Sequence, residues 1–108
     1  MSAYYKGDDI SVRITGDATS GLDEIDFSIL LYRGDQTGRY ISYSKTDMTR
    51  IGENVYKLVI DHSVTAALTV GSYTMEIFDA TGYCINKMKA LFTLEDSASK
   101  NLILSNNE

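Results

Sequence analysis

The sequence predicts a single all-β domain, an antiparallel β-sandwich of about seven strands with one short helical turn. Three observations favour this fold class. Apolar and polar residues alternate with a period of two over most of the chain, which is the pattern of half-buried strands. Clusters of Gly, Asp, Asn and Thr separate the apolar runs, as turns between strands do. Strand–helix–strand alternation is not found in the sequence, so a parallel sheet is not expected.

The first half of the chain contains three predicted strands, which span residues 8–15, 25–33 and 39–44. The second of these has apolar residues on both faces, so we predict that it is a central strand. A hairpin loop over residues 34–38 joins it to the third. Residues 46–50 are compatible with a short edge strand or with a loop.

The second half contains three further strands, predicted over residues 55–61, 72–79 and 83–94. Between the first two, the alternation stops at His62. We predict one helical turn there, capped by Ser63 and ended by Gly71. Six or seven short strands with regular turns are typical of the immunoglobulin-like sandwich, to which we assign residues 1–94.

Residues 95–108 form a polar tail with one apolar triplet, Leu102-Ile103-Leu104. Two interpretations remain open for this triplet. It adds a strand to a sheet of its own domain or of a neighbouring one, or it is the start of an element that the chain does not continue. Strand exchange between subunits would produce a homo-oligomer.

Composition excludes several classes of partner. With 108 residues the chain has the size of one domain, and its net charge is −5. An acidic surface disfavours nucleic acid and anionic membranes. No apolar run approaches the roughly 20 residues that a membrane span needs. The N-terminal residues contain no apolar stretch of the kind that a secretory signal has, so the cytoplasm is the location that this sequence predicts.

No catalytic or cofactor site is predicted, so we expect a protein that is not an enzyme and needs no cofactor. His62, the single histidine, lies between Asp61 and Ser63, and neighbours in sequence do not provide triad geometry. We interpret it as a surface residue at the helix start. The single cysteine, Cys84, excludes an internal disulfide and is expected to be a buried apolar residue. One His and one Cys do not form a zinc site.

Two groups of residues are candidates for binding. Acidic clusters at residues 8–9, 23–26 and 95–96 contain the oxygen ligands that calcium prefers, although solvated turns explain them better. Among eight tyrosines, Tyr40 and Tyr43 point to opposite faces of their strand, so we expect at least one to be exposed. Together with Leu102, Ile103 and Leu104, they form the predicted protein interface.

Four segments carry a family resemblance; they are K-G-D-D-I at residues 6–10, V-Y-K-L-V-I at 55–60, T-A-A-L at 65–68 and V-G-S-Y-T-M-E-I at 70–77. A strand, a helical turn ending in Leu, and Gly-x-Tyr before the next strand resemble the N-terminal sandwich domain of phage baseplate upper proteins. Related immunoglobulin-like modules of phage tails and bacterial surface proteins are similar. The resemblance implies a virion module that assembles through protein contacts with itself or with other proteins. The alternative is a bacterial module that binds a glycan or another surface ligand.

Overall fold

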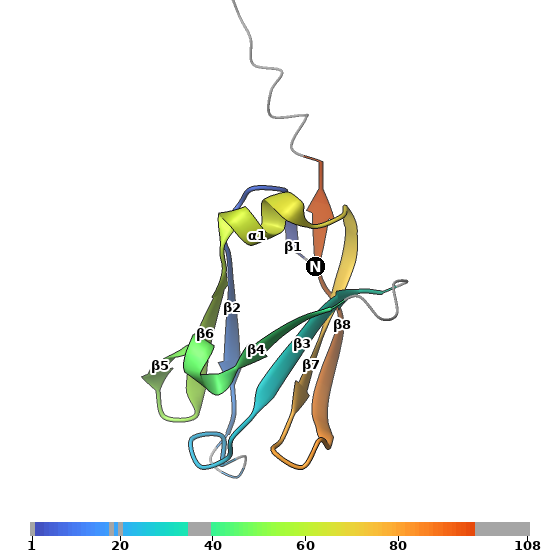
Figure 1. Cartoon of the computed structure of the whole chain (residues 1–108). Coiled ribbons are helices and arrows are strands. Elements are labelled where there is room, and N and C mark those ends of the chain that lie inside the picture. The colour runs from blue at the N-terminus through green and yellow to red at the C-terminus, as the bar shows by residue number, and fades with distance from the viewer. Residues whose placement is uncertain (1, 18, 20, 35–39, 97–108) are drawn as a thin grey trace, which may run out of the picture.

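The computed structural model describes residues 2–17, 19, 21–34 and 40–96, and eight strands in these residues form two facing sheets (Figure 1). The larger sheet has the order β1-β8-β7-β3-β4 and the smaller has the order β2-β6-β5. The strands are β1 (Ser2–Tyr5), β2 (Ile10–Thr15), β3 (Ser28–Arg33), β4 (Ile41–Ser44), β5 (Thr49–Gly52), β6 (Val55–Ile60), β7 (Gly71–Phe78) and β8 (Cys84–Glu95). A 3-10 turn, η1 (Lys45–Asp47), and a helix, α1 (His62–Ala67), complete the described elements.

The prediction of an immunoglobulin-like sandwich is confirmed. In that fold, strands B, E and D share one sheet, and strands G, F and C share the other, which C′ extends in the variable type. Here β2, β6 and β5 occupy the places of B, E and D, and β8, β7, β3 and β4 occupy those of G, F, C and C′. One pair differs from the predicted antiparallel arrangement, because β1 runs parallel to β8.

The core lies between the two sheets and follows the predicted period of two. Alternate residues of β2 and β6 are buried, and the central position predicted for β3 is confirmed by its pairing with β7 and β4. Two aromatic contacts anchor the core. Phe27 meets Tyr56 edge to face with ring centres 5.3 Å apart, and Tyr73 stacks on Phe92 at the same separation. The buried apolar residues are Ile10, Val12, Ile14, Leu22, Phe27, Ile29, Leu31, Tyr56, Leu58, Ile60, Tyr73, Met75, Phe92 and Leu94.

The connection from β6 to β7 crosses between the sheets through α1. The predicted helical turn is confirmed, but its cap is Asp61, which accepts a hydrogen bond from the Ser63 amide at 3.0 Å. The helix ends at Ala67, before the predicted stop. Gly71 instead begins β7 with φ of 143°, where an added Cβ would lie 2.6 Å from Arg33 Cδ. After α1, the Tyr73 hydroxyl donates to the Thr69 carbonyl at 2.6 Å, which is the tyrosine corner of immunoglobulin-like folds.

Other boundaries also differ from the predictions. β3 begins three residues later than expected, because residues 22–25 form a turn. The ambiguous residues 46–50 divide between η1 and β5. β1 was not predicted, since four residues carry little alternation. Among the described residues, the helical segments are too short to cross a membrane.

Candidate functional site

Two strand edges on the same side of the sandwich, one of β2 and part of one of β8, have no described strand along them. β6 pairs with one edge of β2, and no described strand pairs with the other. In the larger sheet, β1 pairs with β8 only along residues 92–95. Residues 84–91 of β8 therefore have an outer edge that no described strand covers. Open edges of this kind present backbone N–H and C=O groups that are available to another strand.

A groove with a volume of about 280 Å³ lies between these two edges, and we call it the β2–β8 groove. Most of its surface is apolar, and Met88 is 54% exposed within it. A smaller hollow of about 160 Å³ continues the groove toward β1 and shares Leu91 with it. The apolar residues of the groove are Val12, Ile14, Met75, Ile77, Met88 and Leu91, and its polar rim contains Arg13, Thr15, Asn86 and Lys87.

A bulge in β8 lies beside the point where β1 stops. Tyr73 pairs with Phe92 and Met75 pairs with Met88, so β8 has three residues where β7 has one. Ala90, within the bulge, has φ of 53°, in the left-handed region that disfavours residues with a Cβ. Bulges bend a strand and increase its twist. The part of β8 before the bulge therefore runs in a different direction from residues 92–95, which pair with β1.

The groove lies where the constant-type immunoglobulin fold has its strand A. In the constant-type fold, strand A lies beside strand B in the sheet that also contains E and D. β2 has the place of strand B, and no described strand takes the place of A next to it. In the part of the chain that the structure describes, the smaller sheet therefore ends one strand early.

The structure describes two of the five residues of the predicted interface, Tyr40 and Tyr43. Tyr40 is 60% exposed just before β4, whereas Tyr43 is half-buried and packs against the core. Burial, with a further contribution from Asp47, raises the pKa of Tyr43. Leu102, Ile103 and Leu104 lie outside the described residues, so their part in an interface stays a prediction.

Cys84 is exposed at the start of β8, so the expectation of a buried cysteine was wrong. The reason is the register of the larger sheet: Cys84 pairs with Phe78, which pairs with Ser28, and these residues lie on the face that points away from the core. Its thiol donates a hydrogen bond to the Asn86 carbonyl at 3.3 Å.

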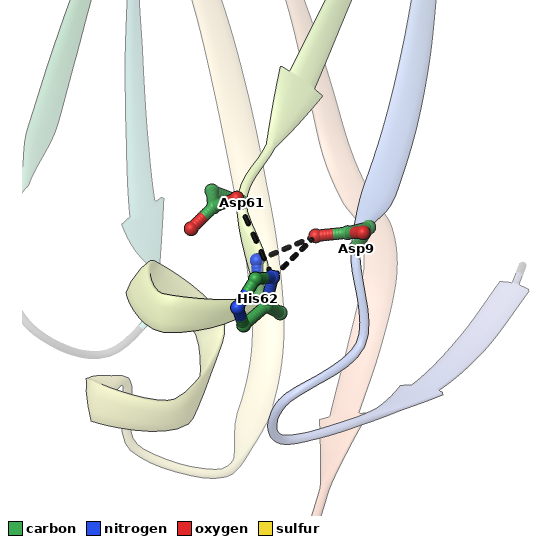
Figure 2. A group of neighbouring side chains, drawn as sticks. All are labelled: Asp9, Asp61 and His62. Atoms are coloured by element: carbon green, nitrogen blue, oxygen red, sulfur yellow. Dashed lines mark hydrogen bonds and ion pairs between the residues drawn. The ribbon is translucent and has the colours of Figure 1, made fainter.

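Asp9, Asp61 and His62 form the one cluster of potential metal ligands in the described residues (Figure 2). His62 Nδ1 lies 3.2 Å from Asp9 Oδ1 and 3.5 Å from Asp61 Oδ1. The predicted surface position of His62 at the helix start is confirmed. Sequence reasoning missed the contribution of Asp9, because it lies 53 residues from His62.

The cluster already has a structural role. Asp9 accepts a hydrogen bond from the His62 amide at 2.6 Å, and Asp61 accepts one from the Ser63 hydroxyl. The Ser63 hydroxyl and amide hold the pKa of Asp61 below its usual range. The carboxylates thus cap α1 and join it to the start of β2. All three side chains are exposed, so we interpret the cluster as a helix cap and not as a metal centre.

One of the acidic residues at 23–26, Asp23, also has a structural role. Asp23 accepts two hydrogen bonds from Arg50, at 2.9 and 2.8 Å, and one from the Tyr56 hydroxyl at 2.8 Å. The bidentate hydrogen bond from Arg50 is the main reason that the pKa of Asp23 lies far below its usual range. The Asn54 amide donates to the same carboxylate at 3.1 Å. These contacts use both carboxylate oxygens of Asp23.

The side chain of Lys45 binds the backbone carbonyls of the same turn. Its ammonium lies over the rings of Phe27 and Tyr56, 5.6 and 5.4 Å from their centres. Its three acceptors are the carbonyl oxygens of Leu22, Asp23 and Ile25, at 3.3, 2.9 and 2.8 Å. The Lys45 ammonium therefore binds three backbone carbonyls of the turn before β3, which Arg50 also contacts through Asp23.

Comparisons with known proteins address the fold. No protein-family model and no curated protein matches this chain. The sandwich is similar to part of the crystal structure of a putative glycoside hydrolase from Bacteroides vulgatus, with a TM-score of 0.54 and 12% sequence identity. The match covers 89% of this chain and 16% of that protein. At this identity the likeness shows a shared sandwich fold alone.

Proposed function

We propose that this chain is a non-catalytic, immunoglobulin-like assembly module that associates with copies of itself and with other proteins. The β2–β8 groove is its contact surface. The observation that carries the proposal is the coincidence of two open strand edges with an apolar groove and a half-exposed Met88.

An extended protein segment is the occupant that such a groove fits best. A strand added to a sheet edge satisfies the backbone groups of that edge, and its alternate side chains enter the groove. Arg13 and Lys87 at the rim are charged residues of the kind that prevent uncontrolled pairing at open edges. The rim thus favours a specific partner over general aggregation.

The proposed setting is a phage tail or a related bacterial protein. The strand, helical turn and Gly-x-Tyr pattern that resembles baseplate sandwich domains supports it, since those domains act through protein contacts. The location in a virion or in the bacterial cytoplasm is part of the same proposal.

Glycan binding is the alternative, supported by the exposed Tyr40 and Tyr83 and by the name of the structural neighbour. Tyr40 precedes β4 and Tyr83 precedes β8, and β3 and β7 lie between these strands. Three strand spacings amount to about 14 Å. The two rings therefore do not form one stacking platform. A thermal shift with a polysaccharide panel, or with calcium, would favour this alternative.

Light scattering on a sizing column tests the assembly function. We expect a defined oligomer for the unaltered chain and dissociation for Met88→Glu, which places a charge in the groove. Ile51→Glu is the matched control, because Ile51 is 44% exposed on β5, at the opposite edge of the smaller sheet. A chain that is monomeric at every concentration, or that dissociates equally with either variant, would contradict the proposal.

A further inference from the structure

The β2–β8 groove raises the question of which segment fills it. Its two walls come from β2 and β8, and its length follows residues 12–15 of β2. An occupant needs an extended backbone and apolar side chains at every second position, with no charge between Arg13 and Lys87. Such an occupant would take the place of the strand beside β2 that the described residues do not contain.

One segment of the chain outside the described residues meets these requirements. Residues 101–105 read N-L-I-L-S, and they are uncharged. As a strand, the segment would direct Leu102 and Leu104 to one face and Ile103 to the other. It is also the one apolar run in the polar residues 95–108.

Within one chain, the segment reaches only the end of the groove that lies nearest to β1. Leu94 pairs with Gly71 and Met88 pairs with Met75, so the two β8 residues are four positions of β7 apart. Asp96 follows two residues after Leu94. The path from Asp96 back to the level of Met88 is therefore about 20 Å. The six residues from 97 to 102 span at most about 20 Å when fully extended, and a reversal of direction uses at least two of them. Leu102 would stop short of Met88, and Leu104 would not pass it, so the end of the groove at Asn86 and Thr15 would receive neither leucine. A second copy has no such limit of length.

We infer that the β2–β8 groove receives residues 101–105 of a second copy of this chain as an added strand. In this arrangement Leu102 and Leu104 of one copy lie on Val12, Ile14 and Met88 of the other, and the backbone pairs with the open edge of β2. The exchange is reciprocal if both grooves are filled, and it gives an oligomer without any other contact. This inference rests on the proposed assembly function.

The test compares two double variants by light scattering over a range of concentrations. Leu102→Asp with Leu104→Asp places charge on the inserting face. Ser97→Asp with Ser99→Asp adds the same charge outside the segment. We expect the leucine pair to raise the dissociation constant of the oligomer about a hundredfold or more, because each buried leucine is worth at least a factor of ten. We expect the serine pair to leave it within about threefold, since exposed charges away from the contact contribute little.

A second readout locates the contact. A spin label on Cys84, the single thiol of the chain, marks the open edge of β8. In a mixture of spin-labelled chains and isotope-labelled chains, the label should broaden the amide signals of residues 101–105 in the other copy. Circular dichroism checks that each variant keeps its sheets, and Met88→Gln replaces Met88→Glu if the charged variant unfolds.

The outcomes separate this inference from the assembly function. If Met88→Glu dissociates the oligomer and the leucine pair does not, another segment fills the groove, and the inference is wrong while the function stands. If both variants remain oligomeric, both proposals are wrong. A monomeric parent chain, with no broadening of residues 101–105, also overturns both.

Discussion

Two tyrosine hydroxyls provide a matched test of the fold, because Tyr→Phe removes the same oxygen at both positions. Tyr73 is 3% exposed, and its hydroxyl donates a hydrogen bond to the Thr69 carbonyl at 2.6 Å. The Tyr43 hydroxyl is also buried, but it has no hydrogen-bond partner among the described residues. The two substitutions should therefore change the free energy of unfolding differently.

Tyr73→Phe should reduce the free energy of unfolding by about 1 kcal/mol, the net contribution of one hydrogen bond. Thr69 is an exposed residue, so water can bind its carbonyl in the variant. The loss of stability therefore stays at about 1 kcal/mol. For a domain of this size the melting temperature falls by about 4 °C. Tyr43→Phe should leave stability unchanged or raise it by up to about 1 kcal/mol, because it removes an unpaired buried oxygen.

Urea unfolding, followed by circular dichroism, measures both variants against the parent chain. The dependence of the unfolding free energy on urea should be the same for all three, so that the midpoints compare stability directly. Equal destabilisation by the two substitutions would refute the assignment of Tyr73 as the corner and of Tyr43 as an unpaired hydroxyl.

Three further substitutions test the loop contacts and the bulge. Lys45→Met should lower stability by about 2 kcal/mol in the same urea assay, since three carbonyls lose a charged donor; an unchanged midpoint would contradict this. Because Arg50 lowers the folded-state pKa of Asp23 below its ordinary value of 3.8, the stability that this carboxylate contributes is present above pH 4 and is lost as pH falls through the folded pKa. Asp23→Asn should therefore flatten the acid limb of a plot of stability against pH, and an identical slope would refute the interaction. Ala90→Gly should stabilise the chain by about 0.5 kcal/mol in thermal unfolding, because relief of the left-handed conformation exceeds the added chain entropy, and a lower melting temperature would count against the bulge.

The long strands were predictable from the sequence because their side chains alternate with respect to one buried face. β2 and β6 show this directly, and the helical turn between β6 and β7 follows from the break in alternation. β1 was not predictable, because its four residues are defined by a parallel pairing with residues more than 85 positions away. The turn before β3 depends in the same way on Lys45, a distant residue that binds its carbonyls.

The groove was not predictable for a different reason. The bulge in β8 adds two residues relative to β7. Because two is an even number, Met88 and Phe92 still point to the same face of the strand. Alternation therefore places Met88 in the core, and its exposure arises from the open space beside β2. A binding surface made from two strand edges appears only when the pairing of all the strands is known.

Amide hydrogen exchange at low and high protein concentration tests the central claim, the open edge of β2, most directly. In an antiparallel pair, every second amide of an edge strand points away from its partner. In dilute solution, alternate amides of β2 should exchange much faster than those of β6, which has a partner on each side. These same amides should become protected when the chain associates at high concentration. Uniform protection of β2 in the dilute chain, or no gain of protection upon association, would contradict the account.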